Sequence, residues 1–157
     1  MRRLLMLFAG LAGLVGAGRP ALAQIDIKSM AMMDGQCRAE IGGQAVSCTP
    51  SGTFVQFGNG RSLFAFSRER VLYSFSGSRV QQRGANSFAL IVDMIRIASE
   101  KAPDRDLGDS RGECLVQTAA NGEPFTAIAC DGHSPGQNAR YRFSLDRISN
   151  FEREAYR

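Results

Sequence analysis

The sequence GQCRAEIGGQAVSC, residues 35–48, places two cysteines around a pair of glycines. Two successive glycines accept positive φ at both central positions of a type I′ turn, which commonly joins antiparallel strands. A hairpin centred between Gly42 and Gly43 places Cys37 directly opposite Cys48. Directly opposed residues have Cα atoms about 4.5–5.5 Å apart, which a disulfide can bridge. This stretch therefore predicts a disulfide-closed β-hairpin.

A second stretch begins in the same way, with GEC at residues 112–114, and ends at Cys130. Because the separation of Cys114 and Cys130 is even, direct pairing centres this hairpin on Gly122 and requires an odd loop or a β-bulge. Pro124 favours an irregular loop, since proline donates no hydrogen bond to a β-ladder. We predict a second disulfide, Cys114–Cys130.

The similar openings of the two stretches suggest an internal duplication. Residues 88–93 and 141–146 share a pattern of an aromatic residue, two apolar residues and an aspartate at the same spacing. We therefore predict a single domain, residues 24–157, with two related halves. The halves span residues 24–98 and 112–157, and residues 99–111 link them.

Residues 1–23 have the features of a cleavable signal peptide. Arg2 and Arg3 precede an apolar run, and Ala21-Leu22-Ala23 fits the small-residue cleavage rule. The apolar run is shorter than the roughly 20 residues that a spanning helix needs, so we expect no transmembrane anchor after cleavage. Removal of this segment leaves sixteen basic and fifteen acidic residues. The basic character of the whole chain is therefore no argument for a nucleic-acid partner.

The predicted localisation is periplasmic or secreted, which is an oxidising environment where disulfides persist. Zinc is the alternative use of four cysteines, but the chain has no Cys-x-x-Cys pair. Met30, Met32 and Met33 suggest Cu(I) ligands, yet methionines are more often flexible core residues. We predict no cofactor and no metal.

The remaining sequence predicts an all-β fold. Alternating apolar and polar residues indicate strands at residues 54–57, 63–66, 71–75 and 140–145. Residues 88–97 indicate a strand, with a helix as the alternative, and residues 79–86 a polar loop. Ser149 and Glu152 resemble a helix capping box and suggest a short C-terminal helix. We predict a small antiparallel sandwich or barrel.

Two motifs associated with function are present but lack their usual context. Residues 132–136 spell Gly-x-Ser-x-Gly, the nucleophile-elbow pattern, without the strand-to-helix turn or a separate histidine base. Asp104, Asp106 and Asp109 resemble a calcium loop but lack its glycine and its final glutamate. A glycine- and proline-rich loop and a solvated linker are the better interpretations.

Arginines are concentrated in the turns and loops of the first half of the chain. Binding residues often lie in such segments, which predicts a partner-binding surface. The partner would be an envelope protein or a polyanionic polysaccharide. The candidate residues are Arg61, Arg68, Arg70, Arg79 and Arg83.

The sequence therefore favours an exported, non-catalytic β protein that binds a partner through its loops or an exposed strand edge. The alternative is a small hydrolase with two carboxylates, because Asp and Glu are the plausible acids and bases in this chain. Asp93 and Asp146, at matching positions of the two halves, are the candidate pair.

Overall fold

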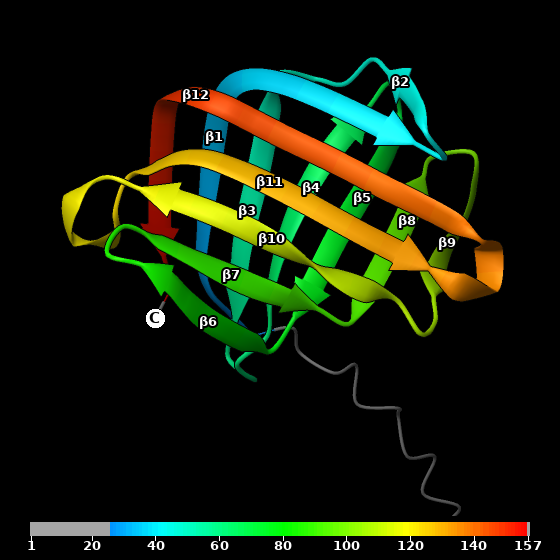
Figure 1. Cartoon of the computed structure of the whole chain (residues 1–157). Coiled ribbons are helices and arrows are strands. Elements are labelled where there is room, and N and C mark those ends of the chain that lie inside the picture. Colours follow the sequence, from blue (N-terminus) through cyan, green and yellow to red (C-terminus); the bar gives the residue numbers. More distant parts are fainter. Residues whose placement is uncertain (1–25, 157) are drawn as a thin grey trace, which may run out of the picture.

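The computed structural model describes residues 26–156, which form an antiparallel β structure with two short 3-10 helices (Figure 1). The elements are β1 (Ile27–Ile41), β2 (Gln44–Val46), β3 (Ser51–Phe57), β4 (Ser62–Arg68), β5 (Val71–Gly77), β6 (Arg79–Gly84), β7 (Ser87–Val92), β8 (Met94–Ser99), β9 (Ala102–Leu107), β10 (Arg111–Thr118), η1 (Ala120–Gly122), β11 (Phe125–Ser134), η2 (Pro135–Gln137) and β12 (Ala139–Ala155). The predicted all-β class is confirmed.

The strands form one sheet in the order β6-β7-β10-β11-β12-β1-β3-β4-β5-β8-β9, with β2 added beside β1. The sheet curls into a half-barrel with two facing layers (Figure 1). We call the layer of β6, β7, β10 and β11 the front layer. The layer of β3, β4, β5, β8 and β9 is the back layer. The long strands β1 and β12 bend and take part in both layers.

The first bend lies where β1 and β12 cross from one layer to the other. Their pairing shifts register between Asp34 and Gln36, and Arg147 opposite the shift has a φ of 50°. A Cβ atom on Gly35 would lie 2.7 Å from the carbonyl oxygen of Asp146. Glycine therefore permits the close approach of two backbones that the bend requires.

The second bend lies in a long hairpin. One arm of the hairpin is β5 followed by β6, and the other is β7 followed by β8; β5 pairs with β8 and β6 with β7. Ser76 pairs with Met94 before the bend and Arg79 pairs with Ile91 after it, so the register is continuous. The amide of Asp93 donates to the carbonyl of Ser76 at 3.0 Å. A Cβ atom on Gly77 would clash with the Ile91 carbonyl oxygen. Each of these strands thus passes from one layer to the other without losing its partner.

An aromatic core fills the space between the layers. Phe143 of β12 packs on Phe66, Tyr73 and Phe75 of the back layer, with ring centroids 5.0–6.2 Å apart within the cluster. A second cluster surrounds Phe125 of β11, whose ring lies 5.0 Å from that of Phe151. Aromatic pairs at these separations contribute beyond their buried area, so the core holds the two layers in a fixed relation.

Both predicted disulfides are present. Gly42 and Gly43 have positive φ, Ile41 pairs with Gln44, and Cys37 is bonded to Cys48 at a Cα separation of 5.9 Å. In the second hairpin Cys114 pairs directly with Cys130 and is bonded to it. Of the two expected alternatives, an odd loop or a bulge, the bulge occurs: the register shifts between Gln117 and Thr118, and Thr118 pairs with Phe125.

Several local predictions were wrong. The capping-box residues near Ser149 form strand rather than helix, because β12 pairs with the first half of β1 as far as Ala155. Tertiary pairing here overrides a local helix signal. The expected loop at residues 79–86 contains β6, and the linker at 99–111 contains β9. Residues 88–97 are strand, interrupted at Asp93, and not helix.

The structure does not show the predicted duplication, since the first cysteine pair closes a short peripheral hairpin and the second joins two central strands. The predicted signal peptide, residues 1–23, lies outside the described residues. Among residues 26–156, no helix has the length and hydropathy needed to cross a membrane.

Candidate binding site on the front layer

The outer face of the front layer is charged because side chains alternate across its strands. In β12, Tyr141 and Phe143 point into the core, whereas Arg140 and Arg142 are exposed. Asp131 of β11 lies between two buried neighbours and therefore also faces outward. We call this surface the front face.

Three basic residues lie side by side on the front face. Arg111 of β10 pairs with His133 of β11, and His133 pairs with Arg140 of β12. We call these three residues the cationic row. Arg111 and Arg140 therefore flank His133 in one cross-strand row. Arg111 has no carboxylate partner within residues 26–156, which leaves its guanidinium available to a ligand.

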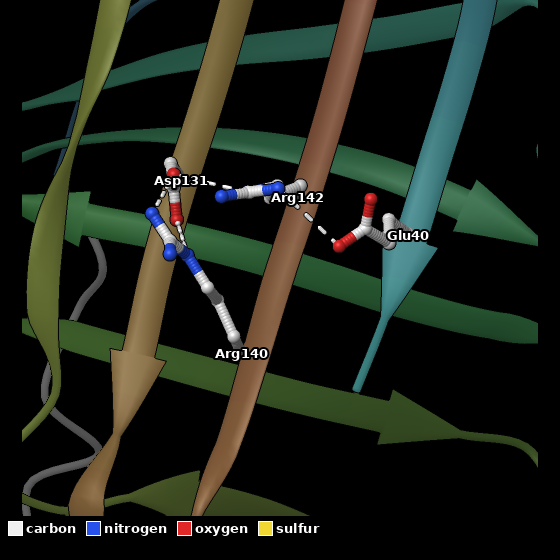
Figure 2. Close-up of polar contacts among 4 residues, drawn as sticks. All are labelled: Glu40, Asp131, Arg140 and Arg142. Atoms are coloured by element: carbon white, nitrogen blue, oxygen red, sulfur yellow. Dashed lines mark hydrogen bonds and ion pairs between the residues drawn. The ribbon is translucent and has the colours of Figure 1, made fainter. Parts of the chain in front are cut away.

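Asp131 binds Arg140 of the cationic row and the neighbouring Arg142 (Figure 2). Its Oδ1 accepts a hydrogen bond from Arg140 Nε at 2.7 Å, and its Oδ2 accepts bonds from Arg140 Nη2 at 2.5 Å and Arg142 Nε at 3.2 Å. Arg142 also contacts Glu40 of β1 at 3.3 Å. The hydrogen bond from Arg140 holds the pKa of Asp131 below its usual value, and Asp131 raises the pKa of Arg140.

Substitution Asp131→Asn should reveal a small, pH-dependent contribution to stability. Because the folded-state pKa of Asp131 is lowered, its contribution is present above the unfolded-state pKa of about 3.9 and is lost as pH falls through the folded value. The side chain is 39% exposed, so we expect a loss of at most about 1 kcal/mol at pH 7. Denaturant unfolding of the wild type and of the Asp131→Asn variant at neutral and acid pH measures this loss of stability. A stability difference between the two proteins that grows in acid would contradict this account.

Two shallow depressions meet at Asp131. The first has a volume of about 430 Å³ and lies over Ala129 and Ser144, between Arg38, Glu40, Asp131 and Arg142. The second has a volume of about 530 Å³ and is lined by Glu113, Asp131 and the cationic row. Both volumes fall within the range of small-molecule sites. The front face can therefore hold ligand groups at two adjoining positions.

The two outer faces of the molecule differ in charge. Arginines outnumber carboxylates on the front face, where they are Arg38, Arg79, Arg83, Arg111, Arg140 and Arg142 against Glu40, Glu113, Asp131 and Asp146. Carboxylates dominate the outer face of the back layer, where they are Asp34, Asp104, Asp106, Glu152 and Glu154 beside Lys28 and Arg96. The front face is therefore the more positive of the two outer faces.

The structure separates the five arginines that the sequence suggested as partner-binding. Arg79 and Arg83 of β6 lie on the front face, where Arg83 forms an ion pair with Glu113 at 2.6 Å. Arg61 is paired with Asp93 at the second bend and donates to Ser76 Oγ. Arg68 and Arg70 lie at the far end of β4 and in its following turn. Only the two residues of β6 adjoin the site described above.

The candidate catalytic carboxylates are not brought together. Asp93 follows Val92, which shares a cross-strand row with Gly112, Gly132 and Tyr141. Asp146 lies five residues further along β12 than Tyr141, about 16 Å along the strand. Each aspartate instead pairs with an arginine at a bend, Arg61 for Asp93 and Arg38 for Asp146. The spacing exceeds what two carboxylates need to act on one glycosidic bond.

The other two motifs also have structural explanations. His133 is exposed and Ser134 is buried on the opposite side of β11, so the Ser134 hydroxyl is not presented to a substrate. The segment that follows is the three-residue 3-10 helix η2 and not the α-helix of a nucleophile elbow. Asp104 and Asp106 lie on the exposed edge strand β9, where Asp106 binds Arg96. Within residues 26–156, no cluster of three or more His, Cys, Asp and Glu side chains is arranged to hold a metal ion.

Comparisons with known protein families, with curated protein sequences and with solved structures find no match to this chain. The fold and the disulfides define the class of the protein as a disulfide-bonded, antiparallel β protein with a curled sheet. The two disulfides indicate an oxidising environment outside the cytoplasm.

Proposed function

We propose that the protein is an exported, non-catalytic binding module that holds an anionic partner on its front face. The observation that carries this proposal is the cationic row of Arg111, His133 and Arg140. Among residues 26–156 Arg111 forms no ion pair, so its guanidinium would gain a charge-assisted hydrogen bond when an anion binds. The neighbouring Arg142 and the acidic character of the opposite face support the same orientation of the partner.

The partner meets a preformed, rigid surface. The front-face residues project from paired strands whose inner side chains are buried in the aromatic core, including Tyr141 and Phe143. The backbone of such a scaffold loses little conformational freedom on binding, whereas each arginine side chain that the partner immobilises costs about 0.5–1.5 kcal/mol. Binding therefore requires no rearrangement of the sheet, and the residues Arg79 and Arg83 of β6 extend the same surface at its edge.

Retention on an immobilised sulfated polymer tests the proposal. The wild-type protein should bind a dextran sulfate column and elute with salt, because exposed charge interactions are screened. The double substitution Arg111→Ala/Arg140→Ala removes both arginines of the cationic row and should reduce affinity by about tenfold, which corresponds to roughly 1.4 kcal/mol.

The matched control is Arg70→Ala/Arg105→Ala, which makes the same change in net charge at two exposed positions outside the front face. It should leave retention nearly unchanged. Equal losses for the two double variants would show that net charge alone governs binding and would overturn the proposal. Circular dichroism of each variant verifies that the β fold is retained.

We place this function in the periplasm or outside the cell. The support is the signal-like sequence of residues 1–23 together with two disulfides in the folded domain. Protein recovered from the producing cells should begin at Gln24, which N-terminal sequencing measures. Protein that keeps Met1 and accumulates reduced in the cytoplasm would contradict this placement.

A further inference from the structure

Small side chains form the floor of the first depression on the front face. Ala129 of β11 and Ser144 of β12 pair directly across the strands, and Ala45 of β2 closes the far side. Longer side chains surround this floor, chiefly Arg38, Arg142, Glu40 and Asp131. The depression therefore has a floor of small side chains and a rim of charged side chains.

The charged groups around the floor are of both signs. Arg38 and Arg142 are obligatory donors, whereas Glu40 and Asp131 are acceptors when ionised. Ser144 both donates and accepts. A ligand that satisfies all of them must carry an anionic group for the arginines and hydroxyl donors for the carboxylates.

This mixture discriminates among anionic polymers. A polyphosphate or a nucleic-acid backbone presents charged acceptors at short intervals and would meet the carboxylates of Glu40, Asp131 and Glu113. Like-charge contacts of this kind oppose binding. A sugar acid instead alternates carboxylates with hydroxyl groups, so each acidic residue of the face gains a donor.

The second depression extends the site by a further unit. Asp131 lines both depressions, and the second contains Glu113 beside the cationic row. It therefore repeats the combination of arginines and carboxylates found in the first. Their adjacency suits a chain of linked sugars rather than a single residue.

We infer that these two depressions bind a uronic-acid polysaccharide. The carboxylates of the sugar units accept hydrogen bonds from the arginines, and their hydroxyl groups bind Glu40, Asp131 and Ser144. This inference rests on the proposed function and specifies its partner. The existing ion pairs are no obstacle, because exposed pairs contribute little and can exchange for ligand contacts. Arg142 and Glu40, for example, are 44% and 38% exposed.

Calorimetric titration with tetragalacturonate, dextran sulfate and maltotetraose tests the inference. The wild-type protein should bind tetragalacturonate and dextran sulfate, but the neutral maltotetraose at least tenfold more weakly. Binding of dextran sulfate without tetragalacturonate would overturn the inference and leave the proposed function standing. Binding of neither anion would overturn both.

The variant Glu40→Ala separates recognition of hydroxyl groups from simple charge attraction. Removing a carboxylate should strengthen dextran sulfate binding, because the face becomes more positive. It should weaken tetragalacturonate binding by about tenfold, since a hydrogen bond to a charged group is lost. Glu100→Ala, at an exposed turn of the back layer, is the matched control and should change neither affinity. Stronger binding of both anions to Glu40→Ala would overturn the inference.

Discussion

Replacing Phe143 by alanine should lower the free energy of unfolding by about 3–5 kcal/mol, as for other large aromatic residues removed from a core. Phe143 is 1% exposed, and its ring contacts Phe66, Tyr73 and Phe75 at centroid distances of 5.5, 5.0 and 6.0 Å. These three residues belong to the back layer, whereas Phe143 extends from the front half of β12. The substitution therefore removes contacts between layers as well as buried area.

Guanidinium unfolding with linear extrapolation measures the loss. The control is Leu72→Ala, because Leu72 lies on the outer face of the back layer and is 41% exposed. That change should lower stability by less than about 1 kcal/mol. A larger effect for Leu72 than for Phe143 would mean that the outer face of the back layer is covered in solution, and the account of the core would need revision.

The parts of the fold that were predictable from sequence are those encoded by neighbouring residues. Gly42-Gly43 and the spacing of Cys37 and Cys48 both specify one register, and the structure has it. The alternation around Tyr141 likewise indicates a strand with one buried face. Local turn chemistry and two-residue periodicity act within a few residues, so they can be recognised without knowledge of the partners.

The bends were not predictable in this way. Gly35 and Gly77 lie in segments that resemble a hairpin start and a strand end, but their role is to admit a backbone distant in sequence. The C-terminal strand was missed for the same reason. The residues near Ser149 carry a helix-start signal, but they pair with β1 and so extend the sheet. Such pairing depends on contacts that local sequence does not specify.

The candidate site was only partly visible for a related reason. Arg140 and Arg142 stand out as the exposed residues of a strand, but Arg111 and His133 join them only through the register of β10, β11 and β12. The sequence analysis therefore emphasised arginines in turns. The residues on the front face come instead from central strands of the front layer, where paired neighbours fix their positions.

Replacing Cys114 and Cys130 together by alanine should destabilise the protein by about 3 kcal/mol or more. The bond closes a loop with a sequence separation of 16, for which the chain-entropy estimate is about 3 kcal/mol. Both sulfur-bearing side chains are buried, at 0% and 2% exposure, so the substitutions also leave a cavity. Thermal and guanidinium unfolding under non-reducing conditions measure the effect.

The comparison variant is Cys37→Ala/Cys48→Ala, which opens a loop with a separation of 11. Its entropic effect is nearly as large, but Cys37 and Cys48 are only partly buried and β2 is a short peripheral strand. We expect the smaller loss there. An equal or greater loss of stability in the Cys37→Ala/Cys48→Ala variant would contradict this expectation. It would show that loop closure alone sets the stabilisation by each disulfide and that burial at the centre of the front layer adds nothing.

The Cys114→Ala/Cys130→Ala variant also separates the effect of the disulfide on stability from its effect on binding. The β10–β11 hairpin carries Arg111, Glu113, Asp131 and His133 on its outer side, while Cys114 and Cys130 lie on its inner side. Both cysteine side chains are buried rather than exposed on the front face. As long as the Cys114→Ala/Cys130→Ala protein is folded, backbone pairing keeps the cationic row in register, and its affinity for dextran sulfate should stay within about twofold of wild type. A folded variant that loses binding would mean that the disulfide, rather than strand pairing, fixes the geometry of the front face.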